Sequence, residues 1–138
     1  GEEIIRDTDK VLNAGRKLGK KLLQMPGLPD GIFSSSDFAA MGAMQILQEH
    51  GVKVPEDVAV VGYSNDFSAS IIEPSLTSVD QHTKRMGNFA AQLFLEQVNT
   101  PSKDFTPRKT LLNPKLVIRE SSLRKKNQSM GKATKTRN

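Results

Sequence analysis

Apolar residues recur at helical spacing in several stretches of the chain. Between residues 9 and 24 they return every three or four positions with lysines between them, which predicts an amphipathic helix. Thr8 and Asp9 are expected to serve its first amides, and Pro26 with Gly27 is expected to end it. The same spacing predicts helices over residues 38–50 and 81–98 and a short helical turn over residues 67–72.

Short apolar runs bounded by turn residues lie between these helices. They predict strands at residues 31–33, 58–62, 76–79, 110–112 and 116–118. The run at 58–62 is continuously apolar and rich in β-branched residues, which is typical of a parallel strand covered on both faces. Since helices and strands alternate, the chain is expected to form an α/β domain, a parallel sheet flanked by helices.

Composition excludes several kinds of site. The chain has 138 residues, enough for one domain with a modest core, and it contains no cysteine. Disulfide scaffolds, thiolate zinc sites and cysteine nucleophiles are therefore excluded. Its two histidines, His50 and His82, do not belong to any metal-binding spacing. No metal and no cofactor is expected.

Positive charge is concentrated at one end. The formal net charge is +5, but residues 121–138 hold six basic and no acidic residues, so residues 1–120 carry −1. We therefore expect a folded lobe over 1–120 and a basic, flexible tail over 121–138. The tail is expected to be a solvated extension, with weak, salt-sensitive attraction to DNA as the alternative.

Two further features concern location. The chain has no apolar run of about 18 residues and no secretory leader, so it is expected to be cytoplasmic and not attached to a membrane. It begins at Gly1 without an initiator methionine, which indicates a fragment of a longer protein.

Polar turns follow three of the predicted strands, at residues 34–37, 63–66 and 80–82. Ligands of open α/β sheets bind at the carboxyl ends of the strands. The hydroxyl, amide and carboxylate groups of these turns suit a small polyhydroxylated or heterocyclic ligand. The alternative is purely local: Ser, Asn and Asp also form turns and helix caps, and Asp37 is well placed as an N-cap.

An enzyme is a weaker interpretation. Residues 62–66 approach the G-x-S-x-G nucleophile motif, with Ser64 as the serine and His82 as the available base, but Asp66 replaces the last glycine. The serine run at 34–36 lacks the glycines and lysine of a phosphate-binding loop. We therefore expect no catalytic activity.

Five motifs resemble the effector-domain signature of LacI/GalR-type transcriptional regulators, in that family's order and spacing. They are LPDGIFSSSD (28–37), VPEDVAVVGY (54–63), PSLTSVDQ (74–81), MG (86–87) and LVIRES (116–121). The resemblance implies the two-lobed, periplasmic-binding-protein-like (type I) fold, of which this chain would be most of the C-terminal lobe. It also implies a homodimer in which a small molecule, such as a sugar, controls the binding of operator DNA. The DNA would be bound by an N-terminal helix-turn-helix, which residues 1–30 do not contain.

By position, the resemblance places Ser36, Ser64, Asn65 and Gln81 at the effector, with Asp37 in support. The family commonly has Asn at position 36 and Asp at position 64, so this chain lacks a carboxylate there. The alternative function is one lobe of a periplasmic-type sugar-binding protein that serves transport.

The helix from residue 38 and the segment 67–72 carry more apolar residues than one sheet face requires. The surplus indicates either a subunit interface or a deeper core. The resemblance implies the interface, with five residues at the dimer contact: Phe38, Met41, Phe67, Ile71 and Ile72.

Overall fold

The computed structural model describes residues 2–101 and 106–124, with side chains from residue 7 onward. Its elements, in chain order, are α1 (Glu2–Leu23), β1 (Gly31–Phe33), α2 (Asp37–Glu49), β2 (Ala59–Tyr63), α3 (Ser68–Ile71), β3 (Thr77–Asp80), α4 (Thr83–Asn99), β4 (Lys115–Val117) and the 3-10 helix η1 (Glu120–Ser122). The predicted alternation of helices and strands is confirmed. Residues 125–138, most of the predicted tail, lie outside the described residues.

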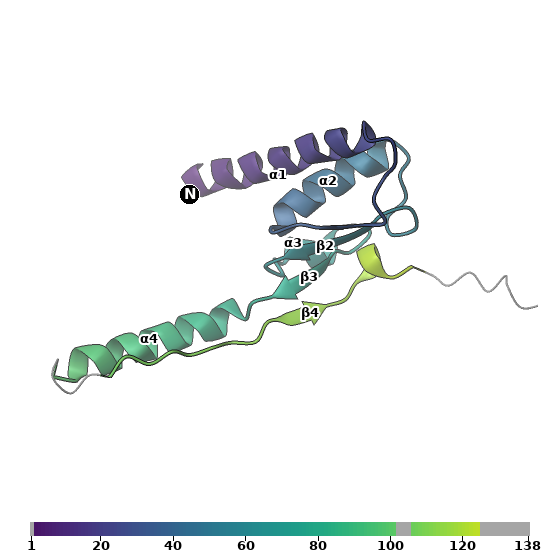
Figure 1. Cartoon of the computed structure of the whole chain (residues 1–138). Helices are drawn as coiled ribbons and strands as arrows, with labels where there is room; N and C mark the ends of the chain where they lie inside the picture. Colours follow the sequence, from purple (N-terminus) through teal and green to yellow (C-terminus); the bar gives the residue numbers. More distant parts are fainter. Residues whose placement is uncertain (1, 102–105, 125–138) are drawn as a thin grey trace, which may run out of the picture.

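The four strands form one open sheet in the order β1-β2-β3-β4. The first three are parallel, as predicted, but β4 runs antiparallel to β3, with Leu116 opposite Val79. After β3 the chain continues away from the sheet through α4 and returns alongside it, so it re-enters the sheet in the opposite direction (Figure 1). Residues 110–112, predicted as a strand, belong to this returning segment and form no ladder.

Two helices are stacked on the sheet: α2 packs on the strands, and α1 packs along α2 (Figure 1). The core joins Met44 of α2 to Val58, Val60 and Leu76 of the sheet layer, all almost fully buried. The two helices approach closely at a glycine, because a Cβ on Gly42 would lie 2.1 Å from a carbonyl oxygen of α1. Helix α2 is therefore buried on two sides, against the sheet and against α1.

The first helix begins earlier than predicted. It starts at Glu2, so Thr8 and Asp9 lie inside it and are not at its N-terminus. No proline or glycine interrupts residues 2–14, and the residues before Thr8 therefore continue the helix without a break.

Helix α4 does not cover the sheet. It projects away from it, and none of its residues is buried. Its apolar side chains stay open to solvent, with exposed fractions of 47% for Met86, 63% for Phe94 and 64% for Val98. The predicted apolar stripe therefore exists. Phe89 and Leu93 lie next to the returning segment at residues 106–110, and the rest of the stripe is open to solvent.

The described fold continues past the predicted boundary at residue 120. Ser121 is fully buried in η1, where its hydroxyl donates to the Val60 carbonyl at 2.6 Å and accepts from the Thr77 amide at 2.9 Å. Arg124 donates to the carbonyl oxygens of Pro55 and Asp30. Residues 121–124 thus belong to the lobe and not to the tail.

Among the helices of the described ranges, none has the length and apolar character that a membrane span requires.

Candidate functional site

The three polar turns that follow β1, β2 and β3 lie together. These strands are parallel neighbours, so their carboxyl ends meet at one edge of the sheet. The first residue after each of β1 and β2 donates a hydrogen bond to the neighbouring strand. The Ser34 amide donates to the Val61 carbonyl at 2.8 Å, and the Ser64 amide donates to the Val79 carbonyl at 3.0 Å. The edge is therefore continuous across the three turns, as the sequence predicted.

Asp37 holds this edge together from inside. Its carboxylate is 1% exposed and accepts hydrogen bonds from the Asp66 amide at 2.8 Å and from the Ser78 hydroxyl at 2.6 Å. The Ser78 hydroxyl in turn accepts from the Asn65 amide at 3.0 Å. One buried carboxylate thus connects the first turn to the second turn and to β3.

The expectation that Asp37 is an N-cap is wrong. Ser36 occupies the N-cap position of α2, and Asp37 is the first residue of the helix. Its side chain reaches across the strand ends because Gly62, beneath it, has no Cβ: one placed there would lie 2.1 Å from the carboxylate. The local sequence pattern predicted the start of a helix at this position, but only the packing shows that the Asp37 carboxylate bonds the Asp66 amide and the Ser78 hydroxyl.

The second turn has an unusual backbone. Ser64 has a backbone φ of 122° and Asn65 a φ of 51°, positive values that residues other than glycine rarely adopt. The carboxamide oxygen of Asn65 accepts a hydrogen bond from the Arg119 guanidinium at 2.7 Å, and Arg119 also donates to the Leu76 carbonyl. Asn65 therefore fixes the turn through its oxygen, and Arg119 is a supporting residue that the analysis of single turns missed.

Three of the predicted site residues have uncommitted polar groups. The hydroxyls of Ser36 and Ser64 and the carboxamide of Gln81 form no hydrogen bond with any residue that the structure describes. Ser64 is exposed, and Ser36 and Gln81 are half-buried. These three groups are available to a ligand at the edge, whereas Asp37 and the Asn65 oxygen are engaged within the protein.

The remaining carboxylates at this edge are also engaged. Asp66 accepts from the hydroxyl of Ser68 at 2.6 Å and from its amide at 2.9 Å, and these bonds hold the pKa of Asp66 below its ordinary value. Asp80 accepts from the His82 amide at 2.7 Å, where His82 adopts a left-handed conformation with φ 54°. The local, turn-forming interpretation therefore holds for these acidic residues.

An aromatic pair completes the edge. The rings of Phe33 and Tyr63 meet edge to face, with centroids 6.4 Å apart, at the ends of β1 and β2. Phe33 is 64% exposed, although it ends a strand that is otherwise an ordinary apolar run. The apolar run at residues 31–33 predicts Phe33 only as part of a strand; its position directly before the serine turn is the signal that places it at the edge.

The five predicted interface residues divide into two groups. Met41 and Ile72 pack against the core cluster, and Phe38 is half-buried. Phe67 and Ile71, on and next to α3, are 77% and 68% exposed. Part of the apolar surplus therefore belongs to a deeper core and part lies on the surface. Within the described ranges, no group of three or more His, Asp or Glu residues is arranged to hold a metal ion.

The chain is similar to known proteins over most of its length. Residues 2–122 match the model of the periplasmic binding protein-like domain. The HTH-type transcriptional repressor PurR of Actinobacillus pleuropneumoniae serotype 3 (strain JL03) is 33% identical over 120 residues, which are 87% of this chain and 36% of that protein.

Two solved structures share the fold. A complex of the transcriptional regulator CelR with cellobiose has a TM-score of 0.70 at 36% identity, over 83% of this chain and 33% of that one. A LacI family transcriptional regulator from Enterococcus faecium with bound ribose has a TM-score of 0.70 at 28% identity, over 80% of this chain and 40% of that one. The chain thus spans about a third of the length of these relatives.

Proposed function

Since the chain belongs to the family of periplasmic binding protein-like domains, in the form that LacI/GalR-type transcriptional regulators carry, we propose that it binds a small effector molecule at the carboxyl edge of its sheet. In this proposal, effector binding controls DNA binding by another part of the parent protein. The observation that carries the proposal is the grouping of three polar turns on one edge, with the hydroxyls of Ser36 and Ser64 and the carboxamide of Gln81 uncommitted.

The chemistry of the edge favours a neutral, polar effector. A hydroxyl donates and accepts, and a carboxamide does both through separate atoms, so the three groups suit the hydroxyls of a sugar. Asp37 is buried with both carboxylate oxygens engaged, and Asp66 and Asp80 each have one oxygen engaged within their own turn. The exposed ring of Phe33 adds an apolar face against which a sugar or a heterocycle can stack. The relatives solved with cellobiose and with ribose agree with a sugar.

The effector site of the parent protein would have two walls. Helix α4 projects from the sheet with residues 106–114 beside it (Figure 1), and its apolar side chains Met86, Phe94 and Val98 remain exposed. Burying such a stripe against a second lobe would remove its apolar surface from water. We therefore infer that α4 packs in the other lobe and that the effector lies between the two.

The homodimer of the proposed regulator would use the exposed part of the apolar surplus. Phe67 directly precedes the short helix α3 and Ile71 ends it, next to the carboxyl edge. A dimer contact there would lie within a few residues of the Ser64 turn, so that a change at the effector site would reach the interface directly. Met41 and Ile72, which pack against the core, would support that surface from below.

The test uses the parent protein, whose coding sequence upstream of this chain is first read for a helix-turn-helix. Titration calorimetry with mono- and disaccharides and with nucleobases is expected to find one that binds. Ser64→Ala and Gln81→Ala should each weaken that binding about 5- to 30-fold, the effect of one neutral hydrogen bond left unmade at a buried contact. Gln45→Ala, at an exposed position of α2 next to α1, is the control and should bind as the parent does.

Three results would contradict the proposal. A secretory leader in place of the helix-turn-helix would indicate transport, and labelling of Ser64 by a fluorophosphonate would indicate a hydrolase. Unchanged affinity in both variants would mean that Ser64 and Gln81 do not bind the effector.

A further inference from the structure

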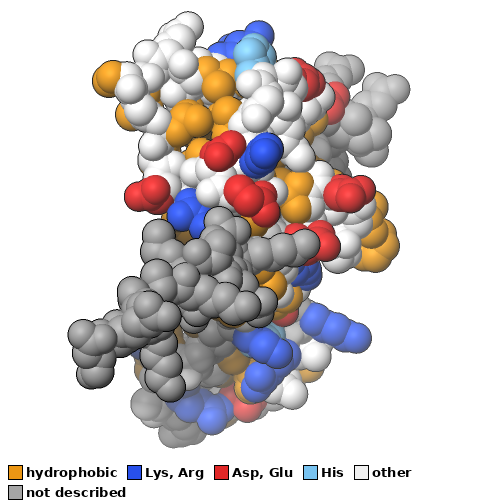
Figure 2. All heavy atoms as spheres, turned by 90° about the vertical axis from the view of Figure 1, so that its right-hand side faces the viewer, with side chains coloured by type: hydrophobic (Ala, Val, Ile, Leu, Met, Phe, Trp, Pro, Cys, Tyr) orange, Lys and Arg blue, Asp and Glu red, His pale blue; other side chains and the backbone are white. Residues whose placement is uncertain are grey.

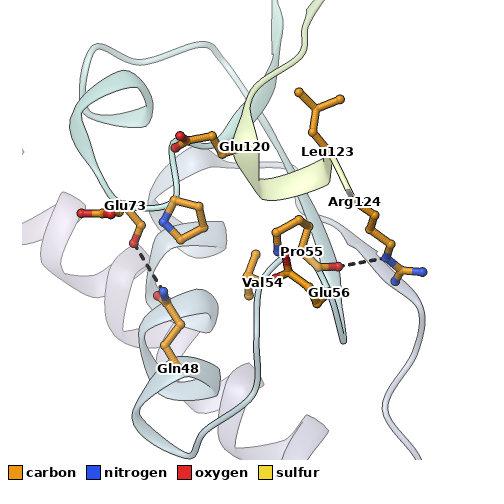
Figure 3. A pocket seen from close by; sticks show the side chains of 9 residues that line it. Gln48, Val54, Pro55, Glu56, Glu73, Glu120, Leu123 and Arg124 are labelled. Atoms are coloured by element: carbon orange, nitrogen blue, oxygen red, sulfur yellow. Dashed lines mark hydrogen bonds between the residues drawn. The ribbon is translucent and has the colours of Figure 1, made fainter. Parts of the chain in front are cut away.

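A large cavity lies at the opposite end of the sheet from the effector edge. Its volume is about 820 Å³, within the range of sites that enclose a small molecule or a peptide side-chain cluster. The segments before β2 and β3 and the end of η1 form its walls. Val54, Pro55 and Leu123 belong to the apolar part (Figure 3), and Pro74 also lines the cavity. These segments precede the strands, so the cavity is separate from the turns that follow them.

Carboxylates surround these apolar walls. Glu56, Glu73 and Glu120 all line the cavity and are exposed at its surface. The carboxylates of Glu56 and Glu73 form no ion pair with any other described residue. Glu120 accepts from the amide and the hydroxyl of Ser75, both at 2.9 Å, and these bonds lower its pKa and keep it ionised.

The single cation in the lining does not neutralise these charges. The Arg124 guanidinium is directed to the carbonyl oxygens of Pro55 and Asp30, as Figure 3 shows for Pro55, and not to a carboxylate. The cavity therefore combines apolar walls with three glutamates that lack a cationic partner among the described residues. Figure 2 views this side of the molecule and shows acidic side chains spread over it.

The chain itself supplies a complementary segment at this position. Leu123 and Arg124 are part of the lining, so the 14 residues that follow, 125–138, start at the cavity wall. This segment contains five Lys or Arg residues and no Asp or Glu. A tethered segment of this length is present at an effective concentration in the millimolar range, on the order of 1 mM or more, so that even weak contacts are populated.

We propose that the basic segment 125–138 docks on this cavity of its own chain. In the proposed arrangement, lysine ammonium groups of the segment would pair with Glu56, Glu73 and Glu120, and the lysine stems would cover the accessible apolar residues Pro74 and Leu123. Lysine suits both parts of the surface because its stem packs on apolar groups while its charge stays at the rim. The contact is partly exposed, so it weakens with salt. Docking also withholds the segment's positive charge from phosphates, which limits its attraction to DNA.

The test places one spin label in the complete 138-residue chain. The chain has no cysteine, so Thr136→Cys gives a single nitroxide site beyond most of the basic residues. Docking is expected to remove most of the amide signal intensity of Gln48 and Glu73, which line the cavity but are remote from the segment in sequence. The amide of Ser64, at the opposite edge, should keep its intensity.

Removing the negative charges of the cavity glutamates distinguishes docking from chance proximity of the segment. Glu56→Gln with Glu73→Gln should restore most of the lost intensity, and so should raising the salt concentration, because both remove the attraction. The matched control, Asp7→Asn with Asp9→Asn on α1, changes the net charge equally at exposed positions away from the cavity and should leave the loss unchanged. Equal intensity loss in all three proteins, or a loss centred on another surface, would overturn the proposal.

Discussion

The carboxylate of Asp37 and the hydroxyl of Ser78 lie 2.6 Å apart in the buried interior, although 41 positions separate them in the chain. Asp37 begins α2 after the first polar turn, and Ser78 lies in the middle of β3. Together with the Asp66 amide, 2.8 Å from the same carboxylate, they join the ends of three strands. The carboxyl edge of the sheet is thus organised by a group that does not itself reach the surface.

Replacement of Asp37 by asparagine should destabilise the lobe. The carboxamide oxygen can still accept from the Asp66 amide, but its NH₂ group then faces the Ser78 hydroxyl, which has to turn from donor to acceptor. Both buried bonds also lose their charged acceptor, which lowers the free energy of unfolding by about 2–4 kcal/mol. Urea denaturation followed by circular dichroism measures the change. Asp30→Asn, at an exposed carboxylate, is the control and is expected to stay within about 0.5 kcal/mol of the parent.

A methyl group at position 62 should have a comparable effect. In Gly62→Ala the new Cβ would lie 2.1 Å from the Asp37 carboxylate and 2.9 Å from the Leu76 side chain, so the carboxylate has to move. We expect a loss of about 1–3 kcal/mol, the range for overpacking of a filled core. Gly87→Ala is the matched control, because its Cβ meets nothing within 4 Å on helix α4. That substitution should leave stability unchanged or raise it by up to about 1 kcal/mol. Equal effects of the two substitutions in thermal unfolding would show that the contact with Asp37 is unimportant.

Ser121 should prove to be part of the fold and not of the tail. In Ser121→Ala the Val60 carbonyl and the Thr77 amide both lose a buried partner, which lowers the free energy of unfolding by about 2–3 kcal/mol. Ser70→Ala removes an exposed hydroxyl bonded to a carbonyl of its own turn and should change stability by less than about 0.5 kcal/mol. Chemical denaturation of the two variants side by side makes the comparison. A value for Ser121→Ala as small as that for Ser70→Ala would place the boundary before η1.

Stability should fall at acidic pH because two carboxyl groups have lowered pKa values. The hydroxyl and amide of Ser68 lower the pKa of Asp66 from its ordinary value of 3.8, and the amide and hydroxyl of Ser75 lower that of Glu120 from 4.5. A group whose pKa is lowered on folding stabilises the fold fully above its ordinary pKa, and the stabilisation is lost as the pH falls through the lowered value. The free energy of unfolding should therefore decrease from about pH 4.5 downward.

The variant Ser68→Ala isolates the contribution of Asp66. It removes the larger cause of that lowered pKa, so the decrease in stability at acidic pH should be shallower than in the parent. Urea titrations between neutral pH and pH 3 measure the slope, and Ser70→Ala again serves as the exposed-serine control. A slope unchanged by Ser68→Ala would mean that Asp66 does not contribute to the acid sensitivity.

The sequence by itself determined the element order and the location of the candidate site. Helical and strand-like spacing identified the α-helices and the three parallel strands of the described chain, because those patterns reflect burial of one helix face or of a whole strand, but they did not identify η1. The rule that parallel strands share their carboxyl edge then placed the turns at residues 34–37, 63–66 and 80–82 together. Both inferences need only local pattern and chain direction.

Only the tertiary structure decided how individual groups are used. The direction of β4 follows from the path of α4 away from the sheet, and no local pattern encodes that path. The same is true of Asp37, which has the sequence position of a helix cap but bonds Ser78 and Asp66 across the strand ends. Ser121, in a polar and basic stretch of sequence, is buried because the backbone groups of Val60 and Thr77 require a partner. Hydrogen-bond partners distant in sequence depend on packing, and packing is a property of the folded chain.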